Sequence, residues 1–286
     1  MKLLLTSDLH RDGTKLLWLL DEAPEHDALL VAGDLLDIFS NSDLAEQTTG
    51  ALRWREAVIA TGKSFAWCSG NHDFFNRNME TPFCAPRGNA QTSRGSPLWM
   101  KEASSSGTCV ADGETRILQA GAERIAISSI PWPVYGRKLI VDGKPIAFLD
   151  FVKRLLHEGK KLRAEEGVPW LILCHEPPGG TPLSATSVPG ARTALEVDFA
   201  SVIQAWQPDF SLHGHIHDAP TAPGGSWIWR IGKTVCFNPG QSSGGEPPQY
   251  ILLDWRGAGD WTALWHGDGR ELRAEATLEN WSVSLE

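Results

Sequence analysis

Short apolar runs recur along the chain and indicate buried strands. Runs of three to five apolar residues are too short for helices and are typical of strands covered on both faces. Longer segments with apolar residues at helical spacing separate them, and this alternation predicts parallel β-α-β units. The predicted strands of this part are residues 3–5, 28–32, 65–68, 116–118, 125–127, 170–173 and 210–212. The predicted helices are 15–22, 44–60 and 147–166, followed by a short helix that Thr193 caps and that ends at Trp206.

The last part of the chain has a strand pattern without helices. Predicted strands there are residues 227–231, 235–237, 250–253 and 261–265. The sequence shows no internal repeat and no linker that would separate two folding units. We therefore expect one two-layered or sandwich-like α/β domain over residues 1–286.

Residues 76–107 break every periodicity. Pro82, Pro86 and Gly88 and the polar run 104–107 interrupt any helix or strand there. A loop of this length is usually functional or disordered. We interpret the segment as a cap or loop excursion over the mouth of an active site, in preference to a merely solvated insertion.

Composition and charge limit the classes of protein that this chain can represent. Apolar residues make up 42% and charged residues 21%, which is ordinary for a globular protein. The net charge of −9 argues against a large basic surface for long nucleic acid. Cys68, Cys174 and Cys236 lie in apolar runs and are expected to be buried reduced thiols. With neither a signal sequence nor a run of 18 apolar residues, the sequence predicts a cytoplasmic protein with no membrane partner.

Five polar clusters follow predicted strands and carry the candidate chemistry. In parallel sheets, functional groups collect at the carboxyl ends of the strands, so clusters far apart in sequence are expected to meet. Their carboxylate, amide and imidazole groups suit Mn, Fe or Zn better than Mg or Ca alone. The clusters are Asp8-Leu9-His10, Gly33-Asp34-Leu35-Leu36-Asp37, Gly70-Asn71-His72-Asp73, Cys174-His175-Glu176 and Gly214-His215-Ile216-His217.

Several of these residues have the spacing of metal ligands. Asp8 and His10 alternate on an extended segment, so both side chains can point to one side and hold one ion. Asp34 follows the second strand and can bridge two ions with its two oxygens. Asn71 offers a neutral amide oxygen, which leaves a metal Lewis-acidic. Three imidazoles, those of His175, His215 and His217, complete a set large enough for two ions.

Other polar residues of the clusters are expected to act indirectly. We interpret His213 as an outer-shell or packing residue. Asp37 either orients a ligand or bound water or caps a helix N-terminus. Arg11 either contacts a substrate phosphate or forms a surface salt bridge.

Taken together, these clusters resemble those of the calcineurin-like binuclear metallophosphoesterase superfamily. The resemblance covers residues 1 to about 240, including Asn238-Pro239-Gly240 after the last histidine pair. It implies an α/β fold with a core of two β-sheets sandwiched by helices, in four α/β/β/α layers. The motifs are specific for the superfamily and poorly specific for its substrates.

The resemblance also implies a role for each residue. Asp8, His10 and His217 would bind one metal, and Asn71, His175 and His215 the other, with Asp34 bridging. His72 resembles the superfamily's non-ligand catalytic imidazole, and Asp73 its orienting partner. Two divalent or mixed-valence ions (Mn, Fe or Zn, with Mn expected to support activity in vitro) would be the cofactors.

The chemistry expected of such a centre is hydrolysis of a phosphoric ester. Two adjacent cations stabilise a hydroxide near neutral pH, which attacks phosphorus in line. Protonated His72 then donates a proton to the leaving oxygen. We therefore expect a phosphodiesterase or phosphatase that acts on a small phosphorylated metabolite or nucleotide.

The sequence departs from the motifs of three branches of the superfamily, and these departures argue against membership of those branches. Purple acid phosphatases carry Tyr where Asp37 stands, and the lipid A pathway pyrophosphatases carry Arg at the position of His72. Protein Ser/Thr phosphatases have Gly in place of Arg11 and Glu in place of Asp73. Two alternatives stay open, a nuclease resembling the SbcD branch and a catalytically inactive metal-bound scaffold for protein binding. Nucleic acid is the less favoured partner, and the sequence does not indicate an oligomeric state.

Overall fold

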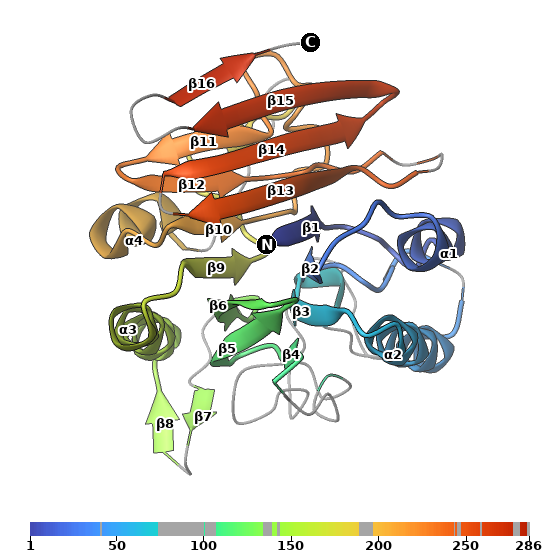
Figure 1. The fold of residues 1–286 in the computed structure, drawn as a ribbon. Coiled ribbons are helices and arrows are strands. Elements are labelled where there is room, and N and C mark those ends of the chain that lie inside the picture. Colours follow the sequence, from blue (N-terminus) through green and yellow to red (C-terminus); the bar gives the residue numbers. More distant parts are fainter. Residues whose placement is uncertain are drawn as a thin grey trace.

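Two large β-sheets pack face to face, and helices lie against the outer faces of their parallel strands (Figure 1). The computed structural model describes residues 1–40, 42–73, 100, 107–133, 139–141, 144–188, 197–242, 244, 247–257, 259–276 and 281–284. The segment 76–107, for which the sequence predicts a cap, lies outside these residues except at Met100 and Gly107. None of the described helices is long and apolar enough to cross a membrane.

The first sheet has eight strands in the order β16-β15-β14-β13-β1-β2-β3-β4. Its strands β1 to β4 run parallel, and β13 pairs antiparallel with β1 and begins an antiparallel meander. The strands are β1 (Lys2–Thr6), β2 (Ala28–Ala32), β3 (Ser64–Cys68), β4 (Cys109–Val110), β13 (Tyr250–Gly257), β14 (Asp260–Gly267), β15 (Arg270–Ala276) and β16 (Trp281–Ser284).

The second sheet has six strands in the order β11-β12-β10-β9-β6-β5. Its four inner strands are parallel, and each edge strand is antiparallel to its neighbour. The strands are β5 (Thr115–Ala120), β6 (Glu123–Ile130), β9 (Trp170–Cys174), β10 (Phe210–Leu212), β11 (Ile228–Ile231) and β12 (Thr234–Phe237). A separate hairpin joins β7 (Leu139–Val141) to β8 (Lys144–Ile146).

Helices α1 (Gly13–Asp21) and α2 (Leu44–Ala60) cover the first sheet, and α3 (Phe148–Glu166) and α4 (Phe199–Trp206) cover the second. Two short 3-10 turns, η1 (Asn71–Asp73) and η3 (Pro182–Ser184), lie in loops. The predicted four α/β/β/α layers are thereby confirmed. The start of α4 was predicted wrongly, because the side chain of Asp198 caps the backbone N–H of Ser201 and the helix begins at Phe199. Thr193, the predicted cap, lies outside the described residues.

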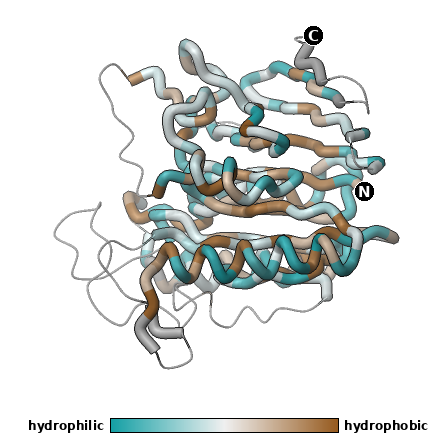
Figure 2. Tube along the Cα trace, turned by 90° about the vertical axis from the view of Figure 1, so that its left-hand side faces the viewer, coloured by the Kyte–Doolittle hydropathy of each residue, from teal (hydrophilic) through white to brown (hydrophobic). Residues whose placement is uncertain are grey.

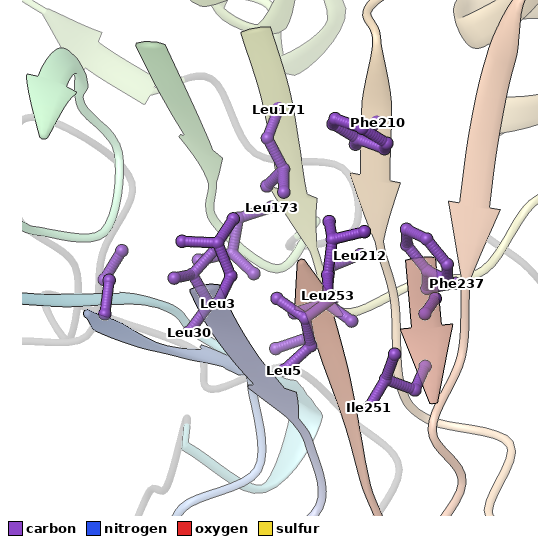
Figure 3. Close-up of a cluster of buried hydrophobic side chains, with 14 of the residues drawn as sticks. Leu3, Leu5, Leu30, Leu171, Leu173, Phe210, Leu212, Phe237, Ile251 and Leu253 are labelled. Atoms are coloured by element: carbon purple, nitrogen blue, oxygen red, sulfur yellow. The ribbon is translucent and has the colours of Figure 1, made fainter. Parts of the chain in front are cut away.

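The main core lies between the two sheets. Its side chains project from both inner faces and are fully buried, as Figure 3 shows for Leu3 and Leu5 of the first sheet opposite Leu173 and Leu212 of the second. Two further hydrophobic clusters lie between the helices and the outer faces of the sheets, and α3 illustrates this packing. This helix faces the viewer in Figure 2 and alternates hydrophobic and hydrophilic positions, because only one side packs on the sheet. The parallel strands β2, β3 and β9 are thus covered on two faces, which explains their continuous apolar runs.

Candidate metal centre

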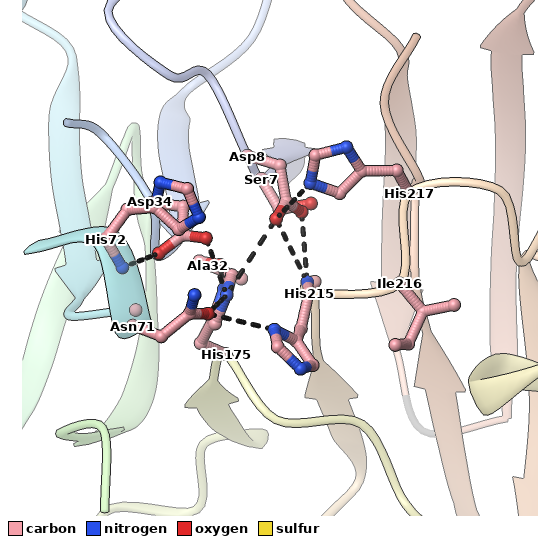
Figure 4. Close-up of polar contacts among 12 residues, drawn as sticks. Ser7, Asp8, Ala32, Asp34, Asn71, His72, His175, His215, Ile216 and His217 are labelled. Carbon is pink, nitrogen blue, oxygen red and sulfur yellow. Dashed lines mark hydrogen bonds and ion pairs between the residues drawn. The ribbon is translucent and has the colours of Figure 1, made fainter. Parts of the chain in front are cut away.

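The polar clusters meet at the carboxyl ends of the parallel strands of both sheets. The loops after β1, β2 and β3 approach this meeting point from the first sheet, and the loops after β9 and β10 approach it from the second (Figure 4). Asp8, His10, Asp34 and His215 have backbone φ angles of 53°, 43°, 54° and 69°. Non-glycine residues adopt this left-handed conformation uncommonly, and such strained positions cluster at functional sites. The local backbone therefore supports a functional interpretation of these loops.

Three glycines allow the ligand loops to interlock. A Cβ at Gly33 would lie 2.5 Å from Nδ1 of His175, one at Gly70 would lie 2.2 Å from Oδ1 of Asp34, and one at Gly214 would lie 2.6 Å from Oδ2 of Asp8. Each glycine directly precedes one candidate ligand and contacts another from a different loop. Gly33 also has a φ of +78°, which favours glycine. These glycines therefore fix the distances between candidate ligands.

Asp8, His10 and His217 form the first group of candidate ligands. Nε2 of His217 lies 3.1 Å from Oδ1 of Asp8 and 3.1 Å from Nε2 of His10. Both carboxylate oxygens of Asp8 accept a hydrogen bond from the backbone N–H of His215 at 3.1 Å, which fixes the carboxylate. One ligand atom from each of the three residues lies within 4.8 Å of the other two. The structure therefore brings together the first predicted ligand set.

The second group contains Asp34, Asn71, His175 and His215. Oδ1 of Asn71 lies 3.2 Å from Nε2 of His175 and 2.9 Å from Nδ1 of His215 (Figure 4). Oδ2 of Asp34 lies 3.1 Å from Nε2 of His175 and 3.9 Å from Nε2 of His10. Asp34 thus contacts residues of both groups, as expected of a bridging carboxylate.

The nitrogen and oxygen atoms of the second group are arranged to bind a cation and not to form hydrogen bonds with one another. Nδ1 of His175 donates to the carbonyl oxygen of Ala32 at 2.6 Å, so in a neutral ring Nε2 carries a lone pair. That nitrogen faces two acceptors, Oδ2 of Asp34 and Oδ1 of Asn71. Converging lone pairs repel unless a proton or a metal ion lies among them. Nitrogen and oxygen donors of this kind suit Mn, Fe or Zn.

The pKa values of the candidate ligands also indicate that the site favours a positive charge. Burial alone would lower the pKa of His175, but the carboxylates of Asp34 and Asp8 outweigh it and raise this pKa to about 10. Burial opposes ionisation of Asp8 and Asp34 too, yet the neighbouring imidazoles hold both pKa values below the ordinary value. Burial and the charge of His175 lower the pKa of His215 to about 4, which leaves that ring neutral and able to bind a metal.

His72 lies beside both groups. Its backbone N–H donates to Oδ1 of Asp34 at 2.8 Å, and its ring centroid lies 4.5 Å from that of His10. The carboxylate of Asp37 also lies close to its ring, with Oδ1 3.8 Å from Nδ1. Burial lowers the pKa of His72, although the charge of Asp34 acts in the opposite direction. A side-chain nitrogen of His72 also lies within 4.8 Å of His10 and Asp34, so the ring borders the metal centre directly.

Asp73 has a different position from the one predicted. Its buried carboxylate accepts hydrogen bonds of 2.8–3.1 Å from four backbone N–H groups, which belong to Asp34, Leu35, Leu36 and Gly70. Burial raises its pKa to about 8, and the charge of Asp34 adds to this, while the amide donors favour the carboxylate. Asp73 thus joins the loops after β2 and β3, and the sequence could not reveal this because the donors are backbone groups.

Asp37, His213 and Arg11 occupy outer positions. Asp37 accepts a hydrogen bond from the backbone N–H of Phe39 at 2.9 Å and lies beside His72 at a distance that forms an ion pair only when that ring is protonated. Both ring nitrogens of His213 are occupied, one by the carbonyl of Glu176 and one by Oγ of Ser211, each at 2.9 Å. This agrees with the packing role. Arg11 forms a salt bridge of 3.2 Å with Glu46, the surface alternative of the two predicted.

Sequence reasoning missed two aromatic residues beside the centre. The ring of Trp132, in the loop after β6, lies 5.1 Å from that of His215 and 5.4 Å from that of His175. The ring of Phe39, in the loop after β2, lies 5.1 Å from that of His72. Both residues follow parallel strands at the end where the ligands collect, and this position in the sequence could have identified them as neighbours of the site. Pro131 and Pro133 suggested only a turn.

Comparisons with known proteins identify the family and the fold. A family model described as calcineurin-like phosphoesterase matches residues 1–219. The structure of TT1561 from Thermus thermophilus resembles the chain with a TM-score of 0.52 and 15% identity, covering 88% of this chain and 93% of that one. This likeness shows a shared fold. No curated protein matches the sequence.

Weaker structural likenesses extend to two larger proteins. A purple acid phosphatase from yellow lupin (Lupinus luteus) seeds has a TM-score of 0.44 and 11% identity, covering 100% of this chain and 52% of that one. A Haemophilus influenzae NAD nucleotidase has a TM-score of 0.41 and 13% identity, covering 100% and 54%. The chain spans about half the length of each.

Proposed function

The chain belongs to the calcineurin-like phosphoesterase family, and we propose that it is a metal-dependent hydrolase of phosphoric esters. The proposed substrate is a phosphomonoester or phosphodiester of a small metabolite or nucleotide. The net charge of −9 supports a small substrate over a long nucleic acid, whose backbone requires a basic surface. A family assignment alone does not establish activity, so the proposal depends on the site.

The convergence of acceptor atoms at His175 carries the proposal. Its Nε2 faces the oxygens of Asp34 and Asn71 at 3.1 and 3.2 Å, while its other nitrogen is held by Ala32. Such an arrangement is stabilised by a cation, and Asp34 also reaches toward the His10 and His217 group. When bound, two adjacent cations polarise a phosphoryl oxygen and lower the pKa of water.

The protein's own side chains supply the remaining functions. Asp8 and Asp34 provide negative charge at fixed positions, because backbone N–H groups of His215 and His72 hold their oxygens. His72 is placed at the rim of the site and would donate a proton to the leaving oxygen. Asp37, 3.8 Å from Nδ1 of His72, would orient the ring and stabilise its protonated form.

We propose Mn, Fe or Zn as the resident ions, with Mn as the metal that supports activity in vitro, because the donors are mixed nitrogen and oxygen. We also propose a cytoplasmic location. The described cysteines Cys68, Cys109, Cys174 and Cys236 are buried and free, which supports a reducing compartment.

An activity screen of the Mn-loaded protein tests the proposal. An aryl monoester, an aryl diester, cyclic nucleotides and single-stranded DNA are compared at matched concentration, with an Asp34→Asn variant as the inactive control. We expect turnover of at least one small ester by the wild type only. Strong DNA cleavage without turnover of small esters would favour the SbcD-like nuclease instead. Bound metal without hydrolysis of any substrate would favour the non-catalytic scaffold.

A further inference from the structure

The surroundings of the metal centre differ between its two sides. On one side, His175 is fully buried and the ring of Trp132 lies against both His175 and His215. On the other side, the side chains of His10 and His217 are 20% and 40% exposed. Among the described residues, the centre is therefore more exposed to solvent at His10 and His217, whereas the His72 side chain beside them is 12% exposed.

Phe39 lies on this more exposed side. Its ring is 5.1 Å from that of His72, in an edge-to-face arrangement, and the residue is 59% exposed. A single exposed apolar side chain is ordinary on a protein surface, so the exposure alone carries no weight. The position of Phe39 is informative, because its backbone N–H donates to Oδ1 of Asp37, the carboxylate that lies beside His72. Phe39 is thereby held next to Asp37 and to His72, the proposed proton donor.

The proposed role of His72 determines what Phe39 contacts. A general acid must lie within hydrogen-bond reach of the oxygen that it protonates. The group attached to that leaving oxygen must then lie beside the His72 imidazole, on the more exposed side of the centre, where Phe39 presents its ring. Trp132 covers the opposite side, and its backbone N–H is held at 3.0 Å by Oγ of Ser69. The leaving group is therefore placed on the Phe39 side.

We propose that the enzyme selects phosphoric esters whose leaving group carries a flat aromatic ring, and that Phe39 determines this preference by contacting that ring. The inference rests on the proposed function, since it assumes that esters are hydrolysed. Ring–ring contacts of this kind depend on the planar faces and not on hydrogen-bond patterns, so aryl groups and nucleobases are both accommodated.

The test compares two leaving groups of nearly equal acidity, one with and one without a ring. The kcat/KM values of 3-phenylpropyl and n-butyl phosphate, and of their methyl diesters, are measured for the wild type and for Phe39→Ala. We expect the wild type to prefer the phenyl ester about fivefold to tenfold, and Phe39→Ala to reduce the ratio to about one because the phenyl ester loses more of its rate than the n-butyl ester. A tenfold ratio corresponds to ~1.4 kcal/mol. Phe39→Leu should give an intermediate ratio.

Leu17→Ala is the matched control, because Leu17 is likewise an exposed apolar residue (58%) but belongs to helix α1, outside the loops that carry the imidazoles. It should keep the wild-type ratio. A ratio unaffected by Phe39→Ala, or an equal loss for both esters, would overturn the inference and leave the proposed function intact. If the wild type hydrolyses neither ester nor any substrate of the activity screen, the proposed function itself fails.

Discussion

Gly70→Ala tests whether the glycines set the geometry of the metal centre. Gly70 does not have a left-handed backbone, so alanine suits its conformation. The added Cβ, however, would lie 2.2 Å from Oδ1 and 2.6 Å from the backbone nitrogen of Asp34. Contacts below 3.0 Å essentially never occur, so Asp34 or the loop must move by about 0.8 Å or more. The substitution thus displaces the candidate bridging carboxylate without removing it.

The expected cost follows from two losses. Overpacking a tight position costs about 1–3 kcal/mol. Moving Asp34 also weakens its 2.8 Å hydrogen bond from the backbone N–H of His72, and a bond to a charged group contributes about 1.5–3 kcal/mol. We expect Gly70→Ala to lower the free energy of unfolding by about 2–4 kcal/mol, which is a fall in Tm of roughly 3–7 °C for a chain of this length. Metal affinity should fall by about 10–100-fold, the effect of disturbing a ligand's support.

Thermal unfolding and metal content by elemental analysis measure both effects on the same samples. Gly50→Ala is the control, because Gly50 lies inside α2 and nothing lies within 4 Å of the added Cβ. Alanine there should stabilise the helix by about 0.5–1 kcal/mol. If Gly70→Ala keeps the wild-type Tm and binds metal with wild-type affinity, the reasoning about interlocking loops is wrong.

Three further outcomes are expected. His72→Ala should keep both metals by elemental analysis yet lose turnover of esters with poor leaving groups; hydrolysis of an alkyl diester at the wild-type rate would contradict the role of His72. Asp34→Asn should reduce metal content itself, and unchanged occupancy would refute the bridging assignment. Metal binding near pH 7 should release protons, because the metal-free His175, with a pKa of about 10, must lose its proton. Affinity should therefore rise with pH up to about 10, and calorimetry in buffers of different ionisation enthalpy would detect the released protons.

The sequence predicted the parallel strands and the ligand clusters well, because both have local signatures. Continuous apolar runs mark strands covered on two faces, and β1, β2 and β9 end within two residues of Asp8, Asp34 and His175. Strand β15 was missed because Leu272 is its only large apolar residue, so its alternation of polar and apolar positions is weak. The hairpin β7–β8 was missed because each strand has only three residues and Pro145 interrupts the second one.

Features that depend on tertiary contacts could not be predicted. Asp73 receives its four hydrogen bonds from backbone groups, three of them more than thirty positions away. The resemblance suggested that this residue orients His72, whereas the structure has Asp37 beside that ring. The placement of Phe39 depends on how the loop after β2 turns toward η1, and no residue pattern encodes that turn visibly.

The candidate ligands come from both halves of the sandwich, with Asp8, Asp34 and Asn71 on one sheet and His175 and His215 on the other. Cations held there would join the two halves as well as perform chemistry. Binding at a hundred times Kd adds about 2.7 kcal/mol to the native state. A cell short of the metal would therefore lose more than turnover, because chains that open more often are degraded faster. Metal supply would then set how long each molecule survives.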